Sequence, residues 1–261
     1  IMSLPTIKQL RYFVSLENYQ HFGRAADACF VSQSAFSTAI RELETTLKVQ
    51  LVDRTNKNVT VTHIGRQIAN EARRCLRDVE NLVELARSNH TPLTGELRIG
   101  IIPTIAPFLL PKVMPQLKLA FPQLKLLLTE DITLRLHNKL LDGELDLVLL
   151  ALPYAMSNVE ILPLFKDRFY LACREDSQHL KPQNYSFNAL AAESILLLED
   201  GHCLRDHALA ACHIQDLDKV NRFNATSILT LVQMIDADLG ISFLPQMVEN
   251  SPLLAGTQVK L

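Results

Sequence analysis

Two cysteines, Cys203 and Cys212, lie nine residues apart in the stretch LEDGHCLRDHALAAC. His202 precedes the first cysteine, and Arg205 and His207 lie between the two. Side chains of these types are compatible with three kinds of site: a redox-active thiol pair, a metal site, or a buried helix in which cysteine is a small apolar residue. The spacing of the thiols along the chain helps to choose among them.

The spacing argues against a metal site. If the segment is helical, Cys203 and His207 share a face, but Cys212 lies roughly 13 Å further along the axis at about 1.5 Å per residue. Only two ligands could then meet, and no CxxC or HxxxH pair in this stretch supplies a tetrahedral set. We therefore predict neither a metal nor a cofactor here.

The two cysteines are expected in different surroundings. Cys212 follows small and apolar residues at helical spacing, which indicates a place on the packed face of the helix. Cys203 is expected in the first turn of the same helix, after a strand and a glycine. There the positive end of the helix dipole, His202 and Arg205 would lower the pKa of the Cys203 thiol and favour the reactive thiolate.

A disulfide between these cysteines would require a change of conformation. Bonded cysteines need Cα atoms within about 7 Å of each other, which an intact helix between them prevents. An extended connection of eight residues could reach, and closing so short a loop costs little entropy. A disulfide therefore implies that the helix unwinds, so the segment is predicted to be a bistable element of the kind that a redox switch needs.

The elements before this stretch predict a DNA-binding head. A helix that begins after Ser32, a good N-cap, carries an inward apolar stripe, and Gln33, Ser37 and Arg41 recur on its other face. Amide, hydroxyl and guanidinium groups on one helix face can bond base edges or phosphates in the major groove. An ordinary solvated helix face has a similar composition, so the pattern by itself leaves both interpretations open.

A wing and a long helix are predicted to follow. The segment LVDRTNKNVTVTHIG is interpreted as two extended arms of a β-wing that carries Arg54 and Lys57. The helix after Gly65 has small and apolar residues at alternating spacings of four and three, an a/d seam typical of a dimerisation helix rather than a packed core helix. The seam consists of Ile68, Ala72, Cys75, Val79, Leu82 and Ala86. A dimer of winged helix-turn-helix domains suits two-fold symmetric DNA.

Charge and composition agree with this division. Residues 1 to 90 hold 12 Lys and Arg against 9 Asp and Glu, a charge of +3, and the rest holds 14 against 19, a charge of −5, which together give −2. A basic N-terminal part followed by an acidic C-terminal part indicates that residues 1 to 90 bind a polyanionic partner. The chain has five scattered cysteines, no apolar run long enough for a membrane span and no secretory signal, which predicts a cytoplasmic protein.

From residue 92 onward, strands and helices are predicted to alternate. Apolar strands such as LRIGII, LDLVLLAL and SILLLED favour mostly parallel sheets that are covered on both faces. The region has no glycine-rich phosphate loop, GxSxG elbow or HExxH motif, so we do not expect an enzyme. We predict three parts: a DNA-binding domain over 1–62, a linker helix over 63–91 and a regulatory domain over 92–261.

The segments FVSLENYQHFGRAAD, VSQSAFS, IRELE and VTHIG, at their spacings, resemble the N-terminal domain of LysR-type transcriptional regulators. One departure is Ser34, where many members have proline. The resemblance implies an all-α winged helix-turn-helix domain with a dimerisation linker helix, followed by a two-lobed α/β regulatory domain similar to periplasmic binding proteins. It also implies a tetramer built as a dimer of dimers, with double-stranded operator DNA and RNA polymerase as partners. The implied groove contacts are Ser32, Gln33, Ser37 and Arg41, and the implied phosphate contacts are Arg24, Arg54 and Lys57.

The motifs IIPTIAPFLLP, LEDGHCLRD and ATSILTL resemble the peroxide-sensing branch of the same family. By that resemblance, hydrogen peroxide oxidises Cys203 to a sulfenic acid, and Cys212 resolves it as a disulfide. The implied supporting residues are His202 and Arg205 for the thiolate, and Thr104 and Thr133 for the position of the peroxide.

Several alternatives stay open beside this resemblance. A LysR-type regulator could instead respond to a small effector bound between the lobes. The thiols could also belong to a thiol peroxidase, although the DNA-binding head argues against an enzyme. The two threonines, without the resemblance, would be interpreted as turn or cap residues. The family continues beyond the sequence that ends at Leu261, so the resemblance implies that the closing strand and helix of the first lobe are missing or differently built.

Overall fold

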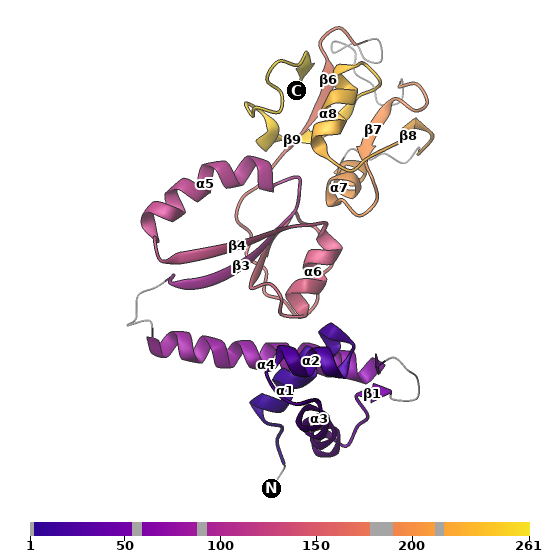
Figure 1. Cartoon of the computed structure of the whole chain (residues 1–261). Coiled ribbons are helices and arrows are strands. Elements are labelled where there is room, and N and C mark those ends of the chain that lie inside the picture. The colour runs from indigo at the N-terminus through magenta and orange to yellow at the C-terminus, as the bar shows by residue number, and fades with distance from the viewer. Residues whose placement is uncertain (1–2, 54–58, 88–92, 178–189, 212–216) are drawn as a thin grey trace. The chain divides into compact units, whose positions relative to one another are not determined.

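The structure, a computed structural model, describes residues 3–53, 59–87, 93–177, 190–211 and 217–261. Contacts divide the chain into two units, which we describe separately (Figure 1). Unit 1 comprises Ile1–Gly95 and Lys139–Asp146, and unit 2 comprises Glu96–Asn138 and Leu147–Leu261. The predicted DNA-binding residues therefore lie in unit 1, and the site around Cys203 lies in unit 2.

Unit 1 is built mainly from helices. Its elements are α1 (Ile7–Tyr19), α2 (Phe22–Ala28), α3 (Gln33–Leu47), β1 (Val52–Asp53), β2 (Thr60–Val61) and α4 (His63–Arg87). Local sequence determines where the helices begin. Thr6 forms a capping box with Gln9 at the start of α1, and the Ser32 hydroxyl accepts the Ala35 backbone N–H at 3.3 Å at the start of α3. The predicted helix after Ser32 is thus confirmed.

The core of unit 1 lies where α1, α2 and α3 meet. Phe13 of α1 and Phe36, Ile40 and Leu43 of α3 are fully buried. The Phe36 ring stacks on Tyr12 with 5.0 Å between the ring centroids. Because the buried residues of α3 recur every three or four positions, its polar residues lie on the opposite face. The inward stripe predicted for this helix is confirmed.

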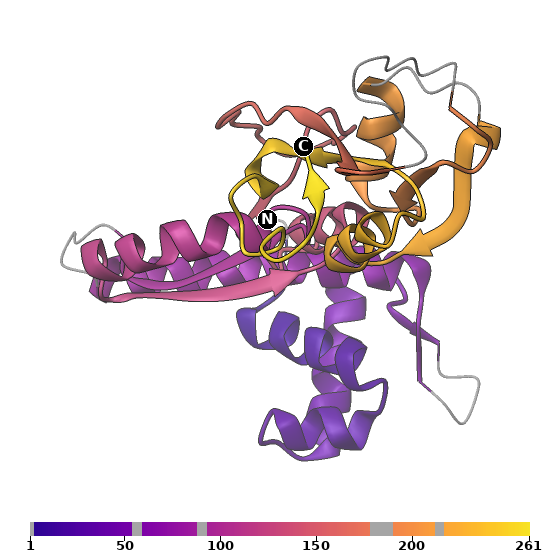
Figure 2. The same ribbon diagram turned by 90° about the horizontal axis from the view of Figure 1, so that it is seen from above.

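The wing predicted after α3 is present as a two-stranded ribbon. β1 and β2 pair antiparallel and extend beside the helices (Figures 1 and 2). The predicted wing tip, with Arg54 and Lys57, lies outside the described residues. At Gly65, near the start of α4, an added Cβ would lie 2.4 Å from the Leu51 carbonyl oxygen, so only glycine lets the helix approach the chain that leads into β1.

The apolar seam of α4 has two differing halves. Ala72 is buried in the core of unit 1, with Ile68 packed beside it. From Cys75 onward the seam is exposed, and Leu82 has 66% of its surface accessible. The prediction of a dimerisation seam along the whole helix is wrong for its first half, because α1 packs there. For the second half it stays a prediction.

The first sheet of unit 2 follows the predicted alternation of strands and helices. Its elements are β3 (Gly95–Ile101), α5 (Ala106–Ala120), β4 (Leu124–Glu130), α6 (Thr133–Leu141) and β5 (Leu147–Leu149). The strand order is β4–β3–β5, and β3 and β5 run parallel. The carboxyl ends of parallel strands meet at one edge of a sheet. The loop after β3, with Thr104, and the segment after β5, with Ala151, therefore share that edge.

The second sheet of unit 2 mixes parallel and antiparallel pairs. Its elements are β6 (Phe169–Arg174), β7 (Ile195–Leu198), α7 (Cys203–Ala211), η3 (Leu217–Lys219), β8 (Val220–Ala225), α8 (Ile228–Asp236), β9 (Ser242–Pro245), η4 (Gln246–Val248) and β10 (Val259–Lys260). β7 and β8 are parallel, and a parallel bridge from Ile195 to Ile241 joins β7 to the start of β9. β6 runs antiparallel to both β9 and β10. The prediction of parallel pairing is wrong for β6, because its partners return from the end of the chain and need no crossover helix.

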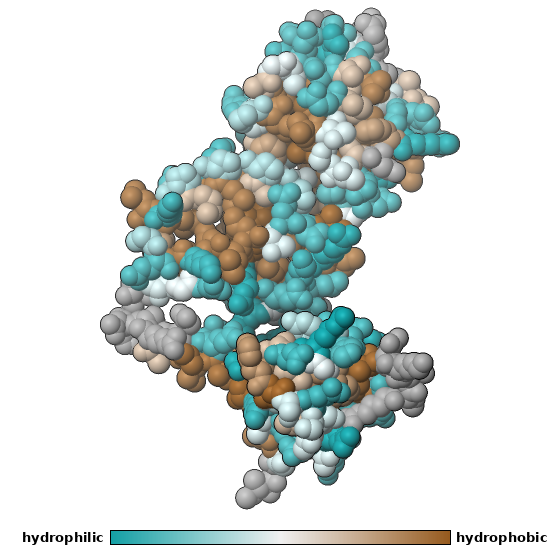
Figure 3. All heavy atoms as spheres, viewed as in Figure 1, coloured by the Kyte–Doolittle hydropathy of each residue, from teal (hydrophilic) through white to brown (hydrophobic). Residues whose placement is uncertain are grey.

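The two sheets differ in how well they are covered. β7 and β9 are buried along their full lengths and pack with α8. In the first sheet Leu127, Leu128 and Leu147 are exposed, and Figure 3 shows apolar side chains at the surface over α5 and β4. The prediction that both faces of a sheet are covered is therefore confirmed for the second sheet. It is wrong for the first sheet, where the described elements leave these leucines exposed to solvent. No described helix is long and apolar enough to cross a membrane.

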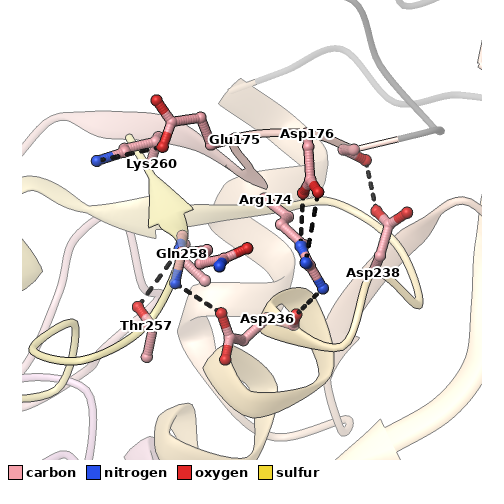
Figure 4. Close-up of polar contacts among 10 residues, drawn as sticks. Arg174, Glu175, Asp176, Asp236, Asp238, Thr257, Gln258 and Lys260 are labelled. Carbon is pink, nitrogen blue, oxygen red and sulfur yellow. Dashed lines mark hydrogen bonds and ion pairs between the residues drawn. The ribbon is translucent and has the colours of Figure 1, made fainter.

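Polar contacts hold the short strand β10 beside β6 and α8 (Figure 4). Arg174, the last residue of β6, pairs with Asp176 at 2.5 Å and donates to the Asp236 carbonyl oxygen at 3.2 Å. The Asp236 carboxylate accepts the Gln258 backbone N–H at 2.7 Å. These bonds join the end of α8 to the sheet that also carries β7, the strand that leads into the site.

Candidate functional site

Cys203 is the first residue of α7, after a short turn that follows β7. In this turn Gly201 has a φ of +96°, and an added Cβ would lie 3.2 Å from the Ile132 side chain, so both backbone conformation and space favour glycine. The Cys203 side chain is 5% exposed and its thiol is free. α7 is helical through Ala211, whereas Cys212 lies outside the described residues. The first thiol therefore opens an intact helix, as the sequence predicts.

Burial raises the pKa of the Cys203 thiol above its usual value of 9.0. Three groups oppose this effect: the Thr133 side chain, the Ala151 backbone N–H and the backbone N–H of Cys203 itself. The Asp206 carboxylate raises the pKa further. The net direction is upward, so the thiol is protonated at neutral pH. Thr133 is the first residue of α6, and Ala151 lies just after β5. Both residues therefore belong to the part of unit 2 that is built around the first sheet.

This direction corrects the lowered pKa that the sequence predicts. Neither His202 nor Arg205 is among the groups that shift the pKa of Cys203. Arg205 instead bonds Asp200 at 2.8 Å and donates to the Leu198 carbonyl oxygen at 3.3 Å, so its charge is compensated while it braces the turn. Burial lowers the pKa of His202, which is therefore neutral at neutral pH and contributes no positive charge.

The two threonines predicted to position a ligand are both buried, Thr133 at 2% and Thr104 at 5% exposure. Thr133 Oγ1 has no hydrogen-bond partner of normal geometry among the described residues, although it lies close enough to the Cys203 thiol to lower its pKa. A buried hydroxyl without a full partner costs free energy, so it marks a place where a further polar group fits. The structure brings Thr133 to the thiol and places Thr104 in the loop after β3.

Sequence reasoning missed the contacts that two histidines of this region make. His207 Nε2 lies 2.7 Å from the Pro153 carbonyl oxygen. His137, one turn after Thr133 on α6, is buried, and its ring packs edge-on against Tyr154 with 5.9 Å between the centroids. No local pattern could have signalled these contacts, because the partners are far apart in sequence. No group of three or more His, Cys, Asp or Glu side chains in the described parts of the chain could hold a metal ion.

The buried His202 predicts a loss of stability in mild acid. Burial lowers its pKa below the usual 6.5, and Glu199, 4.0 Å away, only partly opposes this. Below pH 6.5 the unfolded chain binds a proton there that the folded chain resists, so the free energy of unfolding falls as the pH drops toward the folded pKa. Calorimetry between pH 7.5 and 5.5 should show a smaller fall in melting temperature for His202→Gln than for the wild-type chain. Equal falls for both proteins would contradict this account.

The polar residues of α3 gather on one surface of unit 1. A shallow hollow there is lined by Gln33, Ser34, Ser37, Thr38 and Arg41. Three of the predicted DNA contacts therefore lie together, and Ser34 and Thr38 join them. Arg24 is exposed on α2, and Ser32 is exposed while its hydroxyl caps α3. The hollow presents amide, hydroxyl and guanidinium groups without a carboxylate, as a groove-reading surface requires.

Comparison with known protein families places both units. The description "Bacterial regulatory helix-turn-helix protein, lysR family" matches residues 7–66, and "LysR substrate binding domain" matches residues 90–259. The chain belongs to the LysR family. The predicted combination of a winged helix-turn-helix domain with an α/β regulatory domain is confirmed.

Relatives within the LysR family carry two kinds of name. The chain is 40% identical over 252 residues to the HTH-type transcriptional regulator EstR of Acinetobacter baylyi, covering 97% of this chain and 83% of the relative. It is 40% identical over 242 residues to the hydrogen peroxide-inducible genes activator of Haemophilus influenzae, covering 92% and 78%. The structure of a full-length OxyR variant from Pseudomonas aeruginosa is similar, with a TM-score of 0.78, 34% identity, and coverage of 99% of this chain and 84% of that chain.

Proposed function

We propose that this LysR-family chain is a DNA-binding transcriptional regulator that senses hydrogen peroxide through Cys203 and Cys212 and switches oxidative-stress genes. The observation that carries the proposal is a free, buried thiol beside the unpaired hydroxyl of Thr133 and the backbone N–H of Ala151. Such a site suits a small uncharged molecule that both donates and accepts hydrogen bonds. Hydrogen peroxide has this chemistry, and a relative is named for its response to it.

The proposed chemistry has two balanced steps. The Cys203 sulfur attacks one oxygen of peroxide, the O–O bond breaks, and the departing oxygen takes the thiol proton and leaves as water, so that Cys203 becomes a sulfenic acid. The Cys212 sulfur then attacks the Cys203 sulfur, a second water leaves, and a disulfide forms. Thr133 and the Ala151 N–H would stabilise the charge that develops during the first step. Thr104, His202 and Arg205 would shape the surrounding loop and turn.

Formation of the disulfide would reorganise α7. At about 1.5 Å per residue the intact helix from Cys203 to Ala211 is ~12 Å long, and bonded cysteines need Cα atoms within about 7 Å. The helix must therefore unwind for the bond to close. We propose that this change is the signal that the regulatory domain passes on, and that the chain signals through it rather than acting as an enzyme.

The proposal includes partners and a place of action. The exposed second half of α4, with Val79, Leu82 and Leu85, supports a dimer in which two copies cover this face, and family organisation supports a tetramer built from two dimers. The partners would be double-stranded operator DNA and RNA polymerase, and the protein would act as an activator in the cytoplasm. We keep the domain boundaries 1–62, 63–91 and 92–261 as part of this proposal.

Peptide mapping by mass spectrometry after sub-stoichiometric hydrogen peroxide tests the proposal. We expect one crosslinked pair, Cys203 with Cys212, while Cys173 and Cys75 stay reduced. If Cys203 and Cys212 are modified independently, with no crosslink between them, the redox switch is wrong. Repeated turnover of peroxide with a thiol reductant would favour a thiol peroxidase instead.

The match of residues 90–259 to the LysR substrate binding domain supports a second candidate, a regulator that responds to a small effector bound by its regulatory domain. In that case the unpaired Thr133 hydroxyl and the His137 ring nitrogen, which has no partner among the described residues, would bind the effector. A compound that raises the melting temperature of a Cys203→Ser variant and changes its DNA affinity would favour this candidate. A variant that responds to no such compound would leave the peroxide sensor as the better proposal.

The hollow on α3 predicts the effect of losing one guanidinium. Arg41→Ala should weaken binding to duplex DNA by about tenfold, and reduce the salt dependence of binding by about one charge if Arg41 contacts a phosphate. Fluorescence anisotropy with a duplex enriched from random sequences by the wild-type protein measures both quantities. Arg135→Ala is the matched control, because its side chain is also exposed but lies in unit 2. Equal affinities of Arg41→Ala and wild type would contradict the assignment of this surface.

A further inference from the structure

His207 joins α7 to a segment that is distant in sequence. Its Nε2 lies 2.7 Å from the carbonyl oxygen of Pro153, 54 residues away. A carbonyl oxygen can only accept a hydrogen bond, so His207 Nε2 carries the proton and donates it. The contact therefore requires a proton on Nε2, and it requires α7 to lie against the segment after β5.

The position of His207 on α7 relates it to the reactive thiol. Cys203 and His207 are four residues apart in a helix, so they lie one above the other on the same face. Their partners, Ala151 and Pro153, are two residues apart in the segment after β5. The same stretch of chain thus meets the first turn of α7 at the thiol and its second turn at the imidazole. At the preceding turn Gly201 packs close to Ile132.

The His207 contact is compatible with only one state of the proposed switch. A disulfide between Cys203 and Cys212 closes a loop that contains His207 in its middle. Because α7 is helical from Cys203 to Ala211, and bonded cysteines need Cα atoms within about 7 Å of each other, closing the loop unwinds the turn that carries His207. The bond to Pro153 would then be lost. Arg205, by contrast, bonds to Asp200 in the turn and to Leu198 at the end of β7, and both of these residues precede the loop.

We propose that His207 is a positioning residue that holds α7 helical and docked in the reduced protein, and so slows disulfide closure without changing the reaction of Cys203 with peroxide. The inference rests on the proposed function. A hydrogen bond that exists before closure and is lost during closure adds its net free energy to the barrier for closure. The net free energy that one such hydrogen bond typically contributes corresponds to about a two- to tenfold change in the rate of disulfide closure.

The test compares His207→Ala with His207→Gln. Alanine removes the donor, whereas glutamine keeps an N–H that can reach the Pro153 carbonyl oxygen. Both residues favour helices at least as well as histidine does, so faster closure cannot come from a weaker intrinsic helix. We expect disulfide closure, followed by acid quench and mass spectrometry, to be about two- to tenfold faster in His207→Ala and close to wild type in His207→Gln.

A second measurement isolates the first chemical step. In a Cys212→Ser background, trapping of the Cys203 sulfenic acid should proceed at the same rate with His207, alanine or glutamine. Hydrogen exchange of the reduced proteins should be faster in α7 of His207→Ala, with the protection of β7 and β9 unchanged. The unchanged strands would show that the variant is folded.

The outcomes separate this inference from the function on which it rests. Closure at the wild-type rate in His207→Ala, or equal acceleration in His207→Gln, would overturn the positioning role alone. A changed rate of sulfenic acid formation would also overturn it, because His207 would then act on the thiol. Absence of any Cys203–Cys212 crosslink in the wild-type chain would overturn both proposals.

Discussion

Cys203→Ser should abolish the response to peroxide completely: no sulfenic acid, no crosslink to Cys212 and no peroxide-dependent change in DNA binding. A serine hydroxyl is not oxidised by peroxide. The serine side chain could still form the hydrogen bonds that the Cys203 thiol forms in the reduced protein, so the variant should keep the reduced conformation. Stopped-flow measurement of peroxide consumption, together with peptide mapping, checks this prediction. DNA binding by the reduced protein should stay near the wild-type level, because the substitution lies in unit 2.

Cys173→Ser is the matched control for this substitution. Cys173 in β6 is also free and buried, and burial likewise raises the pKa of its thiol, with Asp238 adding to the effect. Neither Thr133 nor Ala151 is among the groups that act on it. We expect Cys173→Ser to respond to peroxide like the wild type. If both substitutions reduced the response equally, the surroundings of Cys203 would have no special role.

Thr133→Val should slow sulfenic acid formation by about ten- to a hundredfold, the range expected for one lost hydrogen bond to a developing charge. Valine keeps the shape of threonine and removes only the hydroxyl. Because that hydroxyl has no partner of normal geometry among the described residues, the free energy of unfolding should stay equal or rise by about 1 kcal/mol. A slower reaction in a protein that is no less stable is the signature of a group that acts on the ligand.

Thr133→Ser separates the hydroxyl from the methyl group. It keeps the Oγ, so the rate of sulfenic acid formation should return to within a few-fold of wild type, at some cost in packing. The rates come from stopped-flow mixing with peroxide, and the stabilities from urea unfolding of the reduced proteins. A rate for Thr133→Val equal to that of the wild type would mean that peroxide binds without this hydroxyl.

Features that depend on neighbours in sequence were predicted well. The start of α3 follows from the Ser32 cap and from the spacing of Phe36, Ile40 and Leu43, all within four turns of one helix. The start of α7 at Cys203 follows from an apolar strand and Gly201. In each case the residues that determine the element are local, so a single sequence contains the necessary information.

Features that depend on distant contacts were missed or wrong. The pKa of Cys203 was predicted to fall from the residues next to it, but burial raises it, and the two groups that most oppose burial, Thr133 and Ala151, are remote in sequence. The contact of His207 with Pro153 has the same origin. The pairing of Arg205 with Asp200 was within reach, since the two are five residues apart. Long-range packing, rather than composition, decides the electrostatics of this site.

The length of α7 has a consequence for how a regulator of this design would respond to its signal. With nine residues, Cys203–Ala211 is shorter than a helix that is stable by itself in water, which needs about 12 to 15 residues. Its order therefore depends on the contacts that it makes with the rest of unit 2. We expect α7 to be either folded or melted, so a population of molecules exposed to rising oxidant would divide into two states with few between them. Each molecule would then be either fully active or inactive toward its gene. Intermediate levels of transcription would come from the fraction of molecules in which α7 has melted.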